Sequence, residues 1–356
     1  MKCQGRLNCQ GNLDMPTLTL PRVTVFIPVH NRQHYIVSAV DSILAQTFED
    51  FELLVVDDGS TDATLEVLSR YHDPRLRVEC NSRNLGIPAT RNRGLDLARG
   101  EYIALLDSDD KAWPNRLARQ VEVLDRHPEL AQIGSACDFM DANGRRLRKV
   151  RRQPLDPDEV DASLAFYCAL TNRTIMARTA ILRDYRYNED FARCQDYELH
   201  QRLSRTQRMA NLGDVLVCGR EHDGRFTRQT DTLGRERKRE ICRRALLELG
   251  IEPSEEDLDR HYALSRPQKL GTALNRDYLD WTEQWLARLD AANRRTQRHV
   301  PEALLRVMTE RWVQLCLHAR RQLGPGAYLR LLRSPLARRL PAACLRFLRT
   351  PRPLAS

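Results

Sequence analysis

A short apolar segment that ends abruptly in three carboxylates is the feature that most constrains the fold of this chain. Residues 102–106, Tyr-Ile-Ala-Leu-Leu, form a run typical of a strand that is buried on both faces. Asp107, Asp109 and Asp110 follow at once, and carboxylates this close repel one another unless a cation lies among them. The pattern predicts a metal site at the carboxyl end of a parallel strand; a solvated acidic turn is the alternative.

Three more strand-like segments precede this one, separated by helical segments. The strands are predicted at 23–27, 51–56 and 76–80, where apolar residues cluster. Helical spacing of apolar residues is clearest at 35–46. The alternation of strand and helix predicts an α/β fold with a mostly parallel sheet flanked by helices.

A second strand also ends in carboxylates. Asp57 and Asp58 directly follow the segment 51–56. Because parallel strands end at the same edge of a sheet, we expect the two acidic groups to share one crevice, with two unrelated surface turns as the alternative. Neither a GxGxxG motif nor a P-loop follows the first strand, so nucleotide binding is expected through carboxylates and a metal.

The basic charge of the chain is concentrated in its last sixth. Residues 301–356 contain eleven arginines, no lysine and two glutamates, which accounts for the whole net charge of +9. This asymmetry predicts a tail that contacts an anionic surface. No stacking aromatic residues interleave the arginines, which argues against nucleic acid as the partner.

The other compositional signals indicate a cytoplasmic protein. The ten cysteines are scattered singly without a CxxC pair, as is typical of reduced thiols. No run of about eighteen apolar residues occurs, so no membrane-spanning helix is expected. Residues 1–21 lack the apolar segment of a signal peptide, and we expect an N-terminal extension without regular structure.

Four motifs in order resemble the family 2 glycosyltransferases. They are VFIPVHN at 25–31, VVDDGSTD at 55–62, NLGIPATRNRGL at 84–95 and YIALLDSDD at 102–110. The resemblance covers residues 22–230 and implies the GT-A fold for this catalytic domain. Residues 231–356 carry helical periodicity and are expected to form a helical, basic C-terminal region.

The resemblance implies a metal-dependent enzyme with a nucleotide-diphosphate sugar as donor, most often a UDP-sugar. By the same resemblance, Pro28 and His30 line the base and Asp58 hydrogen-bonds it. Asp107 resembles the contact on the ribose side. Arg91 is a candidate for a base or phosphate contact, and a solvated helix residue is the alternative.

The metal ligands and the base are also implied by the resemblance. Asp109 resembles a ligand of Mn²⁺ or Mg²⁺, and His222 completes the metal site or touches the diphosphate. Asp196 matches the catalytic base of a single displacement that inverts the anomeric carbon. Gln195 stands where similar enzymes usually carry Glu, and we expect an active variant. Glu198, expected on the exposed face of the helix, is the second candidate for the base.

The acceptor is implied only in outline. Residues 163–176 resemble the segment that shapes the acceptor side, with a strand at 174–176, and Arg225 and Arg228 could close over the phosphates. Similar enzymes act on glycan or lipid-linked acceptors, which suggests bacterial surface polysaccharide or glycolipid synthesis.

The C-terminal arginines suggest contact with a membrane. Short arginine-rich helices with one apolar face are predicted at 327–333, 336–339 and 342–349, and they suit an anionic membrane surface. This implies a peripheral position on the inner face of the plasma membrane. Docking of their apolar faces on the catalytic domain is the alternative.

Two other functions fit the same chain. A catalytically inactive scaffold that binds sugar nucleotides would account for Gln195. A nucleotidyltransferase shares the fold, but its glycine-rich phosphate loop is missing, because Pro-Val-His-Asn stands at 28–31.

Overall fold

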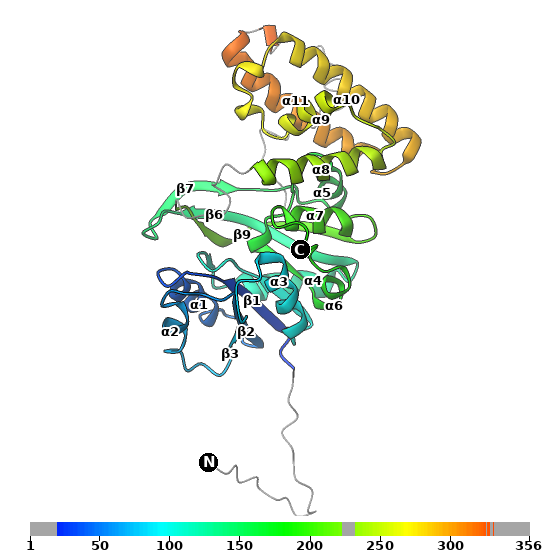
Figure 1. The fold of residues 1–356 in the computed structure, drawn as a ribbon. Helices are drawn as coiled ribbons and strands as arrows, with labels where there is room; N and C mark the ends of the chain where they lie inside the picture. Colours follow the sequence, from blue (N-terminus) through cyan, green and yellow to red (C-terminus); the bar gives the residue numbers. More distant parts are fainter. Residues whose placement is uncertain (1–19, 223–231, 325, 328–329, 331–356) are drawn as a thin grey trace, which may run out of the picture.

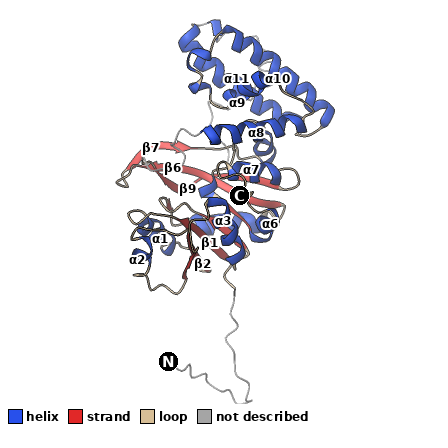
Figure 2. Cartoon of the chain, viewed as in Figure 1, coloured by secondary structure: helices blue, strands red, loops and turns tan. Residues whose placement is uncertain are grey.

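The computed structural model describes residues 20–222, 232–324, 326–327 and 330 (Figure 1). The expected N-terminal extension therefore lies outside the described residues, except for its last two. Strands and helices form a layered body, and a group of helices packs at one end of it (Figures 1 and 2).

The first half of the sheet is parallel, as the sequence predicts. Its strands are adjacent in the order β3-β2-β1-β4 and all run in the same direction. Their bounds are β1 Val23–Val29, β2 Phe51–Asp57, β3 Leu76–Cys80 and β4 Tyr102–Leu105. The helices between them are α1 Ile36–Leu44, α2 Thr64–Leu68 and α3 Ile87–Leu97.

The second half of the sheet is mixed, so the expectation of a mostly parallel sheet describes only the first half. β8 pairs antiparallel with β4 and β6, β6 pairs parallel with β9, and β5 and β7 add antiparallel edges. Strand periodicity reports burial but not pairing direction, which explains the difference. The bounds are β5 Lys111–Ala112, β6 Leu130–Met140, β7 Arg146–Arg151, β8 Met176–Arg178 and β9 Arg208–Arg220.

The strand expected at 174–176 is wrong in position. Residues Asn172–Thr174 form the 3₁₀ helix η1, and β8 begins only at Met176. The buried polar groups of this segment explain the turn, because the Thr174 hydroxyl donates to the Thr171 carbonyl at 2.8 Å.

The central strands are covered on both faces. In β1, Val25 and Ile27 pack in one hydrophobic cluster with α1 and α4 (Arg116–Arg126), and Phe26 packs in another with α3 and α6 (Thr179–Tyr185). This alternation follows from the period of two in a strand. Because both faces of the strand are covered, its sequence is a continuous apolar run rather than an alternation of apolar and polar residues.

The C-terminal helices have a core of their own that also includes α5 (Pro157–Ser163). Trp285 and Trp312 are buried in it, together with Phe166, which follows α5. The helices are α8 Thr232–Glu248, α9 Glu255–Leu264, α10 Arg276–Thr296 and α11 Pro301–Leu323, so the predicted helical region is confirmed as far as it is described.

Only the start of the predicted arginine-rich helices can be described. Ala327 is buried in the C-terminal core, and Arg330 pairs with Asp280 at 2.5 Å. Residues 331–356, which carry most of these arginines, lie outside the described residues. Among the helices that are described, none combines the length and apolar character needed to cross a bilayer.

Candidate active site

An open cleft of about 610 Å³ lies at the carboxyl ends of β1, β2 and β3. His30, Asp57, Gly59 and Asn81 are among its lining residues. Parallel α/β sheets bind ligands in such a crevice. The two acidic strand ends were expected to share it, but only Asp57 lines this cleft; Asp107, Asp109 and Asp110 are not among its lining residues.

His30 and Pro28 lie at the end of β1 and are half-buried. The His30 Nδ1 lies 3.0 Å from the Asp58 carbonyl, and Nε2 lies 3.2 Å from the Asn31 amide. Asn31 takes a left-handed conformation, with φ at 52°, and its side-chain oxygen accepts from the Thr61 N–H. These contacts fix the turn that carries His30 at the cleft.

The predicted base contact, Asp58, is engaged by its own chain. Its carboxylate accepts from the Leu85 and Gly86 N–H groups at 2.8 and 3.0 Å and from the Asn81 amide at 2.7 Å. Asp58 thereby holds the loop that enters α3, and any contact with a base would be additional to these three.

The adjacent Asp57 has a free oxygen. Its Oδ2 accepts from the Ser60 N–H at 2.9 Å, whereas Oδ1 is buried and has no partner among the described residues. A buried carboxylate oxygen without a donor costs free energy. The sequence did not single out this residue, because both carboxylates follow the same strand.

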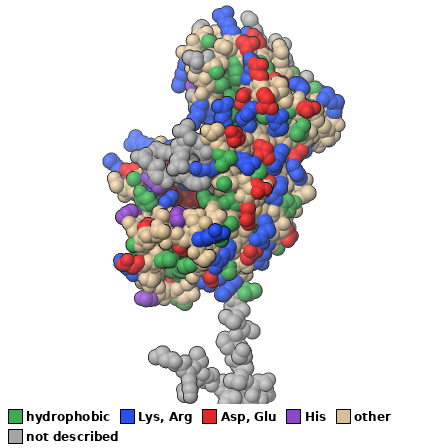
Figure 3. Space-filling view, in the orientation of Figure 1, with side chains coloured by type: hydrophobic (Ala, Val, Ile, Leu, Met, Phe, Trp, Pro, Cys, Tyr) green, Lys and Arg blue, Asp and Glu red, His purple; other side chains and the backbone are tan. Residues whose placement is uncertain are grey.

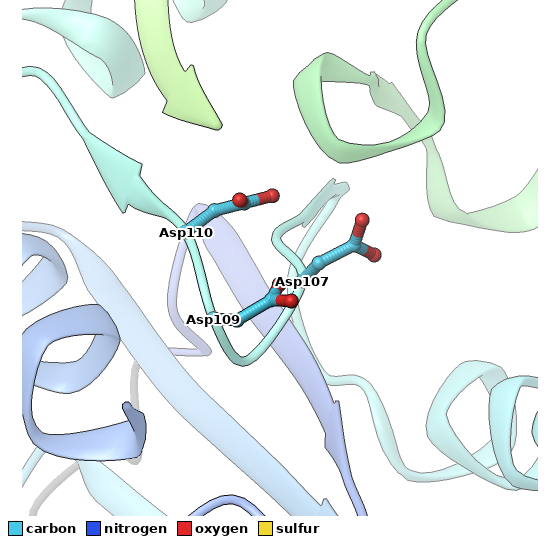
Figure 4. Close-up of side chains that lie close together, drawn as sticks. All are labelled: Asp107, Asp109 and Asp110. Atoms are coloured by element: carbon cyan, nitrogen blue, oxygen red, sulfur yellow. The ribbon is translucent and has the colours of Figure 1, made fainter. Parts of the chain in front are cut away.

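The three carboxylates after β4 come together, as Figure 4 shows. One oxygen from each of Asp107, Asp109 and Asp110 lies within 4.8 Å of the others. Asp110 is 0% exposed, and its oxygens accept from Arg173 at 2.5 Å and from the Arg220 N–H at 2.7 Å. Burial raises the pKa of Asp110 above its ordinary value, and the Arg173 guanidinium offsets only part of this rise. Asp110 is therefore a buried structural carboxylate.

Asp109 and His222 are in contact. The Asp109 Oδ2 and the His222 Nε2 are 2.8 Å apart, and the imidazole ring packs against Tyr35 at 4.7 Å between centroids. Neighbouring ligands of one octahedral ion with bonds of about 2.1 Å lie roughly 3 Å apart. The pair therefore fits a divalent ion without a large movement of either side chain.

Two guanidinium groups flank Asp107. Arg173 lies 3.5 Å from one of its oxygens and Arg91 lies 3.8 Å from the other. Arg91 is buried above the Tyr187 ring, and its Nη1 has no partner among the described residues. The alternative of a solvated Arg91 is therefore wrong, because α3 turns this side chain inward.

Asp196 lies in the first turn of α7 (Gln195–Leu203), and its carboxylate accepts from the Tyr197 N–H at 2.9 Å. The carboxylate is partly exposed, while Gln195 is buried beside it. Burial raises the pKa of Tyr187 to about 12; the Arg91 charge lowers it, and Asp196 and Asp107 raise it. The pKa of the Tyr187 hydroxyl therefore responds both to Asp107, in the acidic cluster, and to Asp196, the candidate base.

Glu198 does not lie on an exposed face, which corrects the sequence expectation. It is 1% exposed and pairs with Arg202 at 2.8 Å and with Arg244 at 3.6 Å. Because α8 packs on α7, both faces of this helix are covered, so Glu198 is held as a structural carboxylate. Arg225 and Arg228 lie outside the described residues.

Sequence reasoning missed Arg173 and Arg220. Arg173 reaches Asp110 across 63 positions, and Arg220 donates from Nε to the Asp109 carbonyl at 2.9 Å. Gly219 makes room for this, since a Cβ there would lie 2.9 Å from the Arg173 Nη1. No local pattern marks either arginine in the sequence.

Comparison with known proteins identifies the family. The model of the family described as Glycosyl transferase family 2 matches residues 24–180. EpsE of Bacillus subtilis (strain 168), a glycosyltransferase by name, is 30% identical over 219 residues, covering 60% of this chain and 77% of EpsE. The chain belongs to glycosyl transferase family 2.

Other similar proteins support the family and the fold. AmsB of Erwinia amylovora, an amylovoran biosynthesis glycosyltransferase, is 28% identical over 219 residues, covering 56% of this chain and 72% of AmsB. The crystal structure of S. aureus TarS 1–349 with UDP-GlcNAc superposes with a TM-score of 0.52 at 21% identity, covering 86% of this chain and 89% of that one. This likeness confirms the GT-A fold of the family 2 enzyme.

Proposed function

We propose that this family 2 glycosyltransferase moves a sugar from a UDP-sugar to an acceptor hydroxyl with inversion at the anomeric carbon. The observation that carries the proposal is the convergence of two groups. Asp109 and His222 are 2.8 Å apart beside Asp107, and Arg91 lies 3.8 Å from Asp107 and over the ring of Tyr187. A donor diphosphate and an acceptor hydroxyl could therefore meet between the acidic cluster and α7.

The donor would lie in the cleft at the ends of β1 and β2. Pro28 and His30 would line the base, and either Asp58 or the free oxygen of Asp57 would accept its N–H. Asp107 would contact the ribose side, and Arg91 would bring positive charge to the diphosphate.

Mn²⁺ or Mg²⁺ is the cofactor of this proposal. Asp109 offers the hard oxygen ligand that these ions prefer, and His222 adds one nitrogen. When bound, the ion supplies Lewis-acid and electrostatic stabilisation of the leaving diphosphate. Asp110 would take no part, because its oxygens already accept from Arg173 and Arg220.

Asp196 would act as the base. It lies at the start of α7, where the Tyr197 N–H already donates to its carboxylate. Asp196 accepts the proton of the acceptor hydroxyl as that oxygen bonds to the anomeric carbon. The bond to the diphosphate oxygen breaks on the opposite face, and its electron pair leaves with the nucleoside diphosphate.

The pathway is inferred from the relatives. AmsB is named for amylovoran biosynthesis, and TarS was crystallised with UDP-GlcNAc. We infer a glycan or lipid-linked acceptor in bacterial surface polysaccharide or glycolipid synthesis, at the cytoplasmic side of the membrane. The arginine-rich segments at 336–339 and 342–349, which lie outside the described residues, would approach the anionic lipid surface.

Isothermal titration of UDP into the full chain, with Mn²⁺ and then with EDTA, tests the donor site. We expect micromolar binding that needs the metal and is lost in Asp109→Ala. Asp184→Ala removes an exposed carboxylate from α6 and is the matched control. Binding without metal, or no binding by the wild type, would overturn the assignment of Asp109.

A second variant separates the base from the donor site. Asp196→Asn should bind UDP as the wild type does, while turnover of UDP-sugars falls by about 10²–10⁴-fold. Asp190→Asn, an exposed carboxylate on the preceding loop, should retain both properties. If the wild type binds UDP but transfers no sugar to any acceptor in a cell-envelope lipid extract, that result would favour the scaffold function.

A further inference from the structure

A basic strand lies beside the proposed donor site. β7 and the residue on each side of it carry six cations over eight positions, and all six are exposed: Arg145, Arg146, Arg148, Lys149, Arg151 and Arg152. We call these six residues the basic strand. Within the described residues β7 pairs only with β6, so its other edge is open. Figure 3 shows Lys and Arg side chains on this part of the surface.

Part of this charge is neutralised by the protein itself. Arg146 pairs with Asp138 at 2.8 Å and lies over the Trp113 ring. Lys149 pairs with Glu221. These contacts anchor the strand on the sheet, and Arg151 also lies over the Phe139 ring.

Three arginines of the basic strand keep their charge available. In the described parts of the chain, no carboxylate lies within ion-pair distance of Arg145, Arg148 or Arg152. Val150 lies among them and is 41% exposed. The strand thus presents uncompensated cations around a single exposed apolar side chain.

The basic strand is linked to the loop that carries Asp109. Arg220 donates from Nη1 to the Ala142 carbonyl, in the turn before β7, at 3.1 Å and from Nε to the Asp109 carbonyl at 2.9 Å. Glu221, the partner of Lys149, directly precedes His222. A surface that binds the basic strand would therefore lie next to the donor site.

We propose that the basic strand docks this enzyme on an anionic membrane surface. Several cations around one apolar side chain, on an open strand edge, match a layer of anionic headgroups above a hydrocarbon phase. The strand contains no aromatic residue that could stack on a base, so a nucleic acid fits less well. The inference rests on the proposed function only where it explains how a lipid-linked acceptor reaches the donor site.

Vesicle flotation of the full chain tests this surface. We expect binding to phosphatidylcholine vesicles that contain phosphatidylglycerol, no binding to pure phosphatidylcholine, and release at high salt. The triple variant Arg145→Gln, Arg148→Gln, Arg152→Gln should bind on the order of 100-fold more weakly. The matched control removes three exposed arginines from α10 (Arg276→Gln, Arg288→Gln, Arg295→Gln) and should bind as the wild type does.

The possible results are distinguishable. Equal binding by the triple variant and the wild type would overturn the proposal, and so would an equal loss in the α10 control, which would indicate net charge alone. Aggregation of the triple variant with unchanged vesicle binding would show that the cations only protect a strand edge. UDP titration of the same variants is independent: its failure in the wild type would overturn the donor site and leave the flotation result intact.

Discussion

At the scale of single residues, adjacent carboxylates have different environments. Asp110 is fully buried with its oxygens bonded, whereas the adjacent Asp109 keeps 14% of its side chain exposed and contacts His222. Asp58 holds a loop, and the adjacent Asp57 keeps one oxygen free. The proposed function therefore assigns the metal contact to Asp109, which the surrounding chain leaves partly exposed.

The ion pair of Arg173 with Asp110 supports a residue-scale prediction. Arg173→Met leaves the Asp110 carboxylate buried without its cation, so we expect a loss of about 3–5 kcal/mol in the free energy of unfolding. Urea denaturation measures this loss. Arg173→Lys keeps the charge and should retain most of the stability.

A double variant isolates the cause. Adding Asp110→Asn to Arg173→Met removes the uncompensated charge and should recover part of the loss. If Arg173→Met were as stable as the wild type, the pair would not stabilise the segment Asp107–Asp110, and Asp110 would not have a structural role.

At the scale of elements, α5 joins the sheet to the C-terminal helices through Asp161. Its carboxylate lies 2.6 Å from the His299 Nδ1 and 3.1 Å from Arg298, in the segment between α10 and α11. Burial alone would raise the pKa of Asp161, but the hydrogen bond and charge of His299 and the charge of Arg298 outweigh it. The pKa of Asp161 is therefore held below its ordinary value.

The sign of this shift predicts the effect of acid. A carboxyl group with a lowered pKa stabilises the fold above its unfolded pKa of about 3.9 and loses that contribution as the pH falls through the folded value. Asp161→Asn should therefore cost about 2 kcal/mol at neutral pH and progressively less below pH ~4. Thermal unfolding of both proteins over this range measures the difference; a constant difference would contradict the assignment.

For individual elements, the sequence predicted whether a segment forms a helix or a strand better than it predicted how these elements pair and pack. Strands in the first half and helices of the C-terminal region follow from periodicities of two and 3.6, which are local properties. The direction of β8 and the 3₁₀ turn before it depend on partners that are distant in sequence. The expected exposure of Glu198 was wrong for the same reason, since α8 covers that face of α7.

At the scale of the whole molecule, the core of the C-terminal helices also includes α5 and the segment that follows it. Ala165 and Phe166 from the segment after α5 belong to it, and the His261 ring nitrogen Nε2 lies 2.8 Å from the Ala165 carbonyl. Burial lowers the pKa of His261 to about 4, so the ring is neutral and donates to that carbonyl. The two parts are held by apolar packing as well as by ion pairs.

This shared core predicts that the sheet is unstable alone. A chain truncated after residue 250 would uncover Phe166 and the buried face of α8, and we expect it to aggregate. Size-exclusion chromatography of this chain and of the full chain makes the comparison. A monomeric truncated protein that still binds UDP would contradict the prediction and establish a separable domain.

The sequence by itself determined the order of strands and helices, the acidic residues at the strand ends and the family. These features are local, because a strand and the residues that follow it are consecutive in the chain. Tertiary structure decided which of these carboxylates are free. Arg173 and Arg220 come from 63 and 110 positions away to bond Asp110, and no periodicity reports such partners. A local pattern can predict that charges gather at a strand end, but their individual roles depend on the distant groups that neutralise them.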